Sequence, residues 1–106
     1  MPKYLIKGRY SPDGARGLLD EGGTARAEAA RKAVESVGGT LESFHFAFGE
    51  TDVYAIADLP DAAAAVATAL TIGSSGKVGV ETVVLLTPVE VDAASKLKAD
   101  YTPPGG

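Results

Sequence analysis

The sequence predicts a small α+β domain with the element order β-α-β-β-α-β, and three patterns support this prediction. Four segments alternate with the two-residue period of a strand, or are rich in β-branched and aromatic residues. Two helical regions lie between them and open with capping residues. The connections are short and contain Gly or Pro. A four-stranded antiparallel sheet with both crossover helices on one side, the ferredoxin-like sandwich, is the simplest fold for this order.

The first strand is predicted over residues 3–10, where even-numbered residues share one face and odd-numbered residues share the other. Ser11 and Pro12 then supply an N-cap and a first-turn proline, which open a helical region. Gly22-Gly23 should break this region, and Gly38-Gly39 should end it. A strand followed by a broken helix therefore forms the first crossover.

A hairpin comes next, with strands predicted over residues 40–48 and 52–59. A helix over residues 62–72 and a last strand over residues 78–86 complete the second crossover. The helix carries no charge, so it needs a cover on a second side. The C-terminal segment, with its tail folded over the helix, or a neighbouring subunit could provide that cover.

The C-terminal segment begins with Thr87, Pro88 and Glu90, which form a capping box and predict an added helix that ends near residue 97. Residues 1–99 are predicted as a single domain, and the Pro- and Gly-rich residues 100–106 as an irregular tail. The chain has neither an internal repeat nor a linker to a second domain.

Both faces of the predicted sheet are apolar. The spacing places Phe44, Phe46 and Phe48 on one side of the second strand, and Tyr54 and Ile56 on one side of the third. We assign all five to the face away from the helices. The helix-facing side receives smaller apolar residues: Leu41, Ala47, Val53, Ala55, Ala57 and Leu59. A continuous aromatic face is rarely left in water, so we expect a homodimer or a larger homo-oligomer.

Composition excludes several classes of function. The net charge is −4 and the ten Lys and Arg are scattered, so nucleic acid is not an expected partner. The chain has no Cys and one His, so we expect neither a metal site nor a cofactor. No secretory signal is apparent, and the longest uncharged apolar run is too short to span a bilayer. We therefore expect a cytoplasmic protein without a membrane partner.

Several stretches together resemble the GYD-domain family and cover nearly the whole chain. They are MPKYLIKGRYSPDGARGLLDEGG, FHFAFGETDVY, DLPD, VLLTPVEVDAA and YTPPG. The Gly-Tyr-Asp element that names the family corresponds here to Gly49-Glu50-Thr51-Asp52, where Thr stands in place of Tyr. The resemblance implies a dimeric α/β-barrel, in which two ferredoxin-like subunits pack sheet to sheet. It implies no particular reaction, so no catalytic residue is carried over.

His45 is the one side chain suited to proton transfer near neutral pH. Asp52 and Tyr54 share one side of the third strand and could orient a substrate or relay a proton. The structural alternative is that His45 is a packed strand residue, Asp52 a turn acid and Tyr54 a core aromatic. Lys3, Lys7 and Arg9 could likewise face a carboxylate ligand, or could pair with acids on neighbouring strands such as Glu81.

These candidates lead to three functional hypotheses. The first is a homo-oligomeric accessory domain that binds a small apolar or aromatic molecule beside Tyr4, Phe44, Phe46 and Tyr54, without catalysis. The second is a cofactor-independent monooxygenase or isomerase with His45 as its base, an idea that depends on analogy between folds. The third is a structural subunit of a larger assembly. A cavity containing His45, Tyr54 or Asp52 would favour the second.

Overall fold

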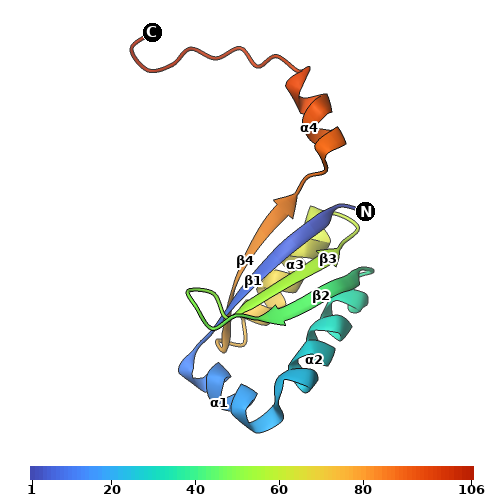
Figure 1. Ribbon diagram of the computed structural model, residues 1–106, viewed down its shortest axis with the longest axis vertical. Helices are drawn as coiled ribbons and strands as arrows, with labels where there is room; N and C mark the ends of the chain where they lie inside the picture. Colours follow the sequence, from blue (N-terminus) through green and yellow to red (C-terminus); the bar gives the residue numbers. More distant parts are fainter.

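The computed structural model describes residues 1–106 and contains a four-stranded antiparallel sheet with α2 and α3 on one side (Figure 1). Eight elements follow one another along the chain: β1 (Lys3–Tyr10), α1 (Pro12–Glu21), α2 (Gly23–Ser36), β2 (Thr40–Phe46), β3 (Val53–Asp58), α3 (Ala62–Gly73), β4 (Val78–Leu85) and α4 (Pro88–Ser95). The strand order across the sheet is β2-β3-β1-β4, and every pair is antiparallel. The predicted α+β, ferredoxin-like arrangement is confirmed.

Capping side chains begin three of the four helices, α1, α3 and α4. Ser11 Oγ accepts a hydrogen bond from the Gly14 N–H at 3.1 Å, which opens α1. Asp61 Oδ1 accepts one from the Ala64 N–H at 2.9 Å, which opens α3. Thr87 and Glu90 form the full capping box of α4. Each cap satisfies a backbone group at the first turn that would otherwise lack a partner.

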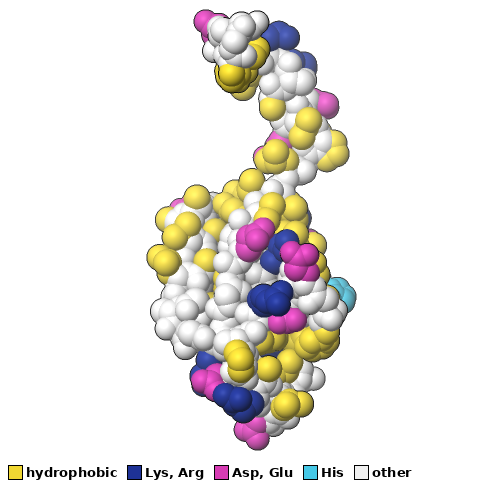
Figure 2. Space-filling view, turned by 90° about the vertical axis from the view of Figure 1, so that its left-hand side faces the viewer, with side chains coloured by type: hydrophobic (Ala, Val, Ile, Leu, Met, Phe, Trp, Pro, Cys, Tyr) yellow, Lys and Arg dark blue, Asp and Glu magenta, His cyan; other side chains and the backbone are white.

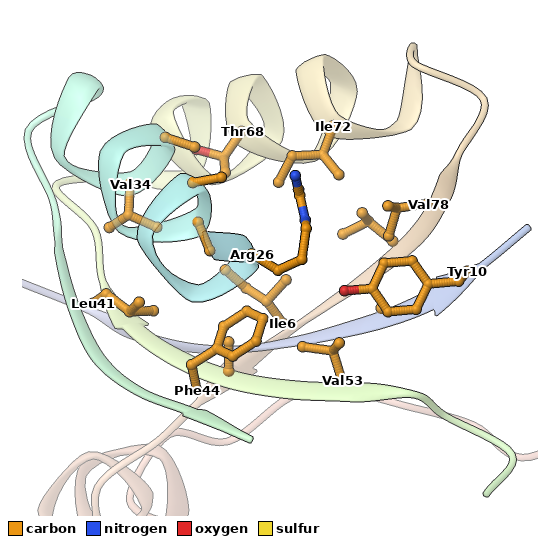
Figure 3. A pocket seen from close by; sticks show the side chains of 16 residues that line it. Ile6, Tyr10, Arg26, Val34, Leu41, Phe44, Val53, Thr68, Ile72 and Val78 are labelled. Carbon is orange, nitrogen blue, oxygen red and sulfur yellow. The ribbon is translucent and has the colours of Figure 1, made fainter. Parts of the chain in front are cut away.

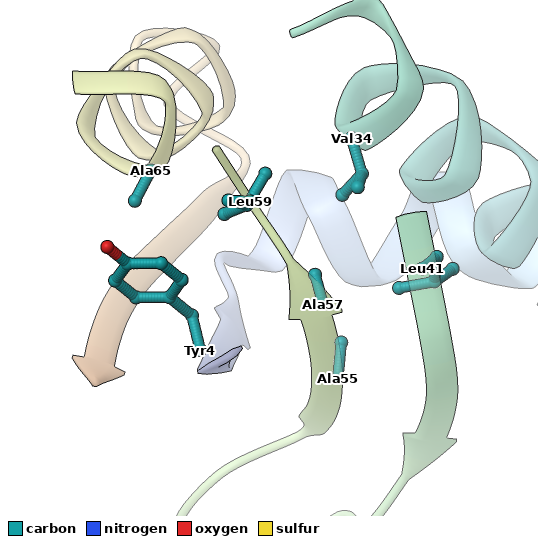
Figure 4. Packing of buried hydrophobic residues seen from close by; sticks show 7 residues of the cluster. All are labelled: Tyr4, Val34, Leu41, Ala55, Ala57, Leu59 and Ala65. Carbon is teal, nitrogen blue, oxygen red and sulfur yellow. The ribbon is translucent and has the colours of Figure 1, made fainter. Parts of the chain in front are cut away.

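The hydrophobic core lies between β1, β2 and β3 on one side and α2 and α3 on the other (Figure 4). Its buried members are Tyr4, Val34, Leu41, Ala55, Ala57, Leu59 and Ala65. Gly39 lies against this core so closely that a Cβ there would be 2.5 Å from the Asp58 carbonyl oxygen. Only 11 of the 106 residues are buried, so the core is thin.

The prediction that the phenylalanines lie on the open face is wrong, because a β-bulge interrupts β2 between Leu41 and Ser43. Leu41 pairs with Ala57 before the bulge, and Phe44 and Phe46 pair with Ala55 and Val53 after it. Residues paired directly across a sheet point to the same face. The extra residue in β2 reverses the alternation, so Phe44 and Phe46 lie on the helix-covered face.

The open face of the sheet combines apolar and charged side chains. Its apolar residues are Leu5, Tyr54, Ile56, Val83 and Leu85. Lys3 Nζ lies 2.6 Å from Glu42 Oε1 and 3.0 Å from Asp58 Oδ1, and Lys7 Nζ lies 3.7 Å from Glu81 Oε1. Figure 2 shows side chains of both signs close together on the body. The pairing of Lys7 with Glu81 confirms the alternative in which strand lysines pair with acids on neighbouring strands.

The C-terminal helix does not cover α3. In Figure 1, α4 and residues 96–106 project from the far end of β4, away from the rest of the chain. All residues of α4 are exposed, and so are Val66 and Leu70 of α3, at 55% and 68%. The prediction that the C-terminal segment folds over α3 is therefore wrong. The capping box at Thr87 turns the chain into a new helix directly after β4, without a loop that could reverse its direction.

Candidate functional site

A narrow cleft lies between the sheet and the two helices that cover it (Figure 3). Its volume is about 90 Å³, and 13 of its 16 lining residues are hydrophobic. β1, β2, β3 and β4 form one side, with residues such as Ile6, Phe44 and Val80, while α2 and α3 form the other. The cleft is therefore an apolar space on the helix-covered face of the sheet.

Small side chains on α2 leave this space open. Ala29, Ala30 and Ala33 face the sheet from α2, and Gly8 faces them from β1. Protein interiors are close-packed, so a run of Ala and Gly between a helix and a sheet leaves room unless larger neighbours fill it. Here Val34 and Phe44 fill only part of it. The shape of the cleft is thus a direct result of the Ala-rich sequence of α2.

Three polar side chains line the cleft. Thr68 Oγ1 donates a hydrogen bond to the Ala64 carbonyl at 2.9 Å, so its polarity is satisfied within α3. In Figure 3 the Tyr10 hydroxyl points into the cleft, and the Arg26 side chain crosses it toward Ile72. Tyr10 and Arg26 are therefore the groups that can meet a ligand.

The environment of Tyr10 keeps its hydroxyl protonated. Burial raises the pKa of Tyr10 above its ordinary value near 10, and the positive charge of Arg26 opposes that rise. A phenol with a raised pKa is neutral at physiological pH, so it can donate a hydrogen bond. It cannot serve there as a base.

The cleft continues into a second hollow of about 250 Å³, and both are lined by Tyr10, Arg26, Ile72 and Val78. The second hollow is more polar. It adds Glu21 from α1 and Lys77 from the loop between α3 and β4, among others. An Arg26 Nη1–Glu21 Oε2 distance of 3.7 Å gives a loose ion pair at this mouth. An apolar interior thus opens through a charged entrance.

The structure places His45, Tyr54 and Asp52 outside the cleft. His45 and Tyr54 pair directly across β2 and β3 on the open face, and both are exposed. Asp52 Oδ2 accepts a hydrogen bond from the Tyr10 backbone N–H at 2.9 Å, so its carboxylate ties the end of the hairpin to β1. Neither the cleft nor the second hollow is lined by any of the three.

Three of the four predicted ligand-binding residues lie on the helix-covered face of the sheet, and the fourth lies on the open face. Tyr4 is buried in the core, where its ring lies under Ala65 (Figure 4). Phe44 lines the cleft. Phe46 stacks on the exposed Phe48, with ring centroids 5.9 Å apart, and Tyr54 lies on the open face. The structure therefore does not bring these four together in one site.

Tyr10 and Arg26 were not identified from the sequence, although both positions carry a signal. Tyr10 lies on the same face of β1 as Tyr4 and Ile6, because alternate residues of a strand share a face, and that face is covered by the helices. Arg26 stands four residues before Ala30 and so extends the inward-facing stripe of α2 by one turn. A charged residue at the end of an apolar stripe beside an aromatic residue would have indicated the entrance.

The structure contains no group of three or more His, Asp or Glu side chains placed to hold a metal ion. None of its helices combines the length and the apolar character needed to cross a membrane. A family model described as GYD domain matches residues 4–94. No curated protein and no solved structure matches the chain. The matched range includes every residue that lines the cleft.

Proposed function

The chain belongs to the GYD domain family, and on that premise we propose that it is a self-associating domain that binds a small apolar molecule in its cleft. The observation that carries this proposal is the apolar cleft between α2, α3 and the sheet, with Tyr10 and Arg26 at its entrance. Binding sites for small molecules are typically concave, mostly apolar and supplied with a few placed polar groups.

The size of the cleft limits the ligand. An apolar cavity of about 150 Å³ is large enough to hold benzene. The cleft measures about 90 Å³, and the adjoining hollow adds space at the entrance. The cleft alone is therefore smaller than a benzene site, and a single ring fits only where it extends from the cleft into the adjoining hollow, whereas a large fused-ring molecule does not fit.

The chemistry of the lining favours binding over catalysis. Tyr10 stays protonated and an Arg side chain stays charged at neutral pH, so neither removes a proton from a substrate. His45, the natural base, lies on the opposite face of the sheet. The proposal therefore assigns no reaction to the cleft.

The exposed surface supports self-association. A folded monomer of 10.8 kDa is expected to expose roughly 5,500 Å², whereas this chain exposes 7062 Å². The difference, on the order of 1,500 Å², includes the fully exposed α4 and tail as well as the open face of the sheet, and a typical stable interface buries ~800 Å² on each partner. The open face carries Leu5, Tyr54 and Ile56 and has no helix over it (Figure 1). We propose that a second copy covers it.

The binding proposal is tested with benzyl alcohol, a neutral single-ring probe that can occupy the cleft together with the adjoining hollow, titrated into ¹⁵N-labelled protein. Amide shifts should concentrate at cleft residues such as Ala33, Thr68 and Val80. Ala33→Leu should fill the space and abolish these shifts. Ala25→Leu is the matched control, because Ala25 lies on the same helix but is exposed, and it should leave binding unchanged.

Two results would contradict the proposal. Shifts spread over the open face instead of the cleft would place the binding site elsewhere. Equal loss of binding in the Ala33 and Ala25 variants would show that the probe does not occupy the cleft.

A further inference from the structure

We propose that the ligand of the cleft is a small amphipathic carboxylate, whose apolar group enters the cleft while its carboxylate lies at the entrance beside Arg26 and Lys77. This inference rests on the proposed function, because it specifies the chemistry of the molecule that the same cleft binds. It follows from three features: the position of Arg26, the charges of the entrance and the donors available there.

Arg26 is positioned where the two hollows meet. It is a first-turn residue of α2 and lines both the apolar cleft and the polar entrance. Figure 3 shows its side chain running across the cleft among Ile6, Ile72 and Val78. A charged side chain kept against apolar neighbours is a recognition group for an opposite charge, since it is costly to desolvate without one.

The charges of the entrance favour an anion. Arg26 and Lys77 supply two positive charges and Glu21 one negative charge. Lys77 takes part in no ion pair. Its backbone is held in place, because its carbonyl accepts the Ser11 N–H at 2.9 Å. The entrance therefore keeps one positive charge that no acid of this chain neutralises.

The pair between Arg26 and Glu21 leaves room for a ligand. The 3.7 Å between Nη1 and Oε2 is longer than a hydrogen bond, and 48% of the Glu21 side chain is exposed. A ligand carboxylate can approach the planar guanidinium with both oxygens, a geometry that the loose pair does not use. The protonated Tyr10 hydroxyl is a further donor on the same side. Glu21 would then compete with the ligand for Arg26.

The experiment compares phenylacetate with phenylacetamide, two probes of nearly the same shape that differ in charge. Each is titrated into ¹⁵N-labelled protein, and dissociation constants are taken from the amide shifts of the cleft. Phenylacetate should bind at least tenfold more tightly than phenylacetamide. Its affinity should fall in 0.5 M NaCl, whereas that of the neutral probe should not.

Charge-neutralising variants test each residue. Arg26→Gln should weaken the binding of phenylacetate about tenfold and change the affinity for phenylacetamide by less than twofold. Lys77→Gln should weaken the binding of phenylacetate about threefold and leave the binding of phenylacetamide unchanged. Because Lys77 is an exposed loop residue, this substitution should not disturb the fold. Glu21→Gln should strengthen phenylacetate binding by removing the competing carboxylate. Arg16→Gln is the control, because Arg16 pairs with Asp13 on α1 and lines neither the cleft nor its entrance.

The possible outcomes separate this inference from the proposed function. If both probes bind the cleft with equal affinity and Arg26→Gln changes neither, the carboxylate preference is overturned while the binding function stands. If Glu21→Gln weakens phenylacetate, the competition is overturned. If neither probe shifts the cleft amides, both the inference and the proposed function are overturned.

Discussion

The two faces of the sheet differ in how they use apolar side chains. The helix-covered face carries small or buried residues such as Tyr4, Ala55 and Ala57, and no charged residue of the four strands points toward it. The open face intersperses Leu5, Ile56 and Val83 with ion pairs around Lys3 and Lys7. The first face is an interior, and the second has the mixed apolar and charged character of a protein surface.

This difference shows why the fold can tolerate an open face in a single chain. The ion pairs of Lys3 and Lys7 are partly exposed and keep the open face hydrated, while the helices exclude water from the other face. Stability should therefore depend mainly on the covered face, and assembly on the open one.

Leu59→Ala should cause the largest loss. Leu59 follows β3 and is fully buried, at 0% exposure, in the core. Removal of a buried Leu side chain usually costs about 2–5 kcal/mol of unfolding free energy. Urea denaturation measures this loss of unfolding free energy. Ile56→Ala, on the open face, is the comparison and should cost clearly less; equal losses would show that the two faces contribute alike.

Gly39→Ala should cost about 1–3 kcal/mol, because the new Cβ would clash with the Asp58 carbonyl oxygen and with Leu59. Gly49→Ala is the matched control, since a Cβ at Gly49 meets no atom within 4 Å. Thermal unfolding of the two variants should separate them by several degrees. A Gly39 variant as stable as its control would mean that the helix and sheet move apart without cost.

Tyr54→Asp should weaken self-association and leave the monomer folded. Tyr54 is 39% exposed on the open face, so an added carboxylate is hydrated in the monomer but becomes buried in a sheet-to-sheet contact. Sedimentation velocity over a concentration series should show a dissociation constant at least tenfold higher than that of the parent. An unchanged constant would exclude this face from the interface.

The ion pairs of Lys3 should contribute to stability only below strongly alkaline pH. The hydrogen bond from Lys3 to Glu42 contributes most to raising the pKa of Lys3, and the hydrogen bond to Asp58 raises it further. A raised lysine pKa stabilises the folded state at pH values below the unfolded pKa near 10.4, and this contribution is lost as pH rises through the folded pKa. Lys3→Met should therefore differ from the parent in urea midpoint at pH 8 and converge with it at pH values above the folded pKa of Lys3.

Removal of residues 88–106 should have the smallest effect on the stability of the body. Every residue of α4 and the tail is exposed, so the truncation uncovers no core residue. The thermal midpoint at low concentration should stay within about 2 °C of the full chain, less than the shift that ~1 kcal/mol would produce. A large fall would indicate a contact between the arm and the body in solution.

The order of helices and strands was largely predictable from the sequence, but the face of the sheet on which each residue of β2 lies was not. Caps at Ser11 and Thr87 and the alternation of β1 identify the elements because these signals are local. The bulge near Glu42 is not visible as a pattern, since it depends on how β2 pairs with β3. A one-residue shift moved Phe44 and Phe46 to the other face. The cleft was also missed, because, like the pairing of β2 with β3, it depends on contacts between different elements of the chain.

The projecting arm gives the molecule a hydrodynamic size that its mass does not suggest. A compact chain of 106 residues has a radius of gyration of roughly 13 Å, whereas this chain has 16.8 Å and a long axis of 55 Å. Such a shape diffuses slowly and leaves a gel-filtration column early. A single copy would elute ahead of a globular 10.8 kDa standard. Column position alone would therefore imitate a dimer, and the number of subunits must be determined from mass.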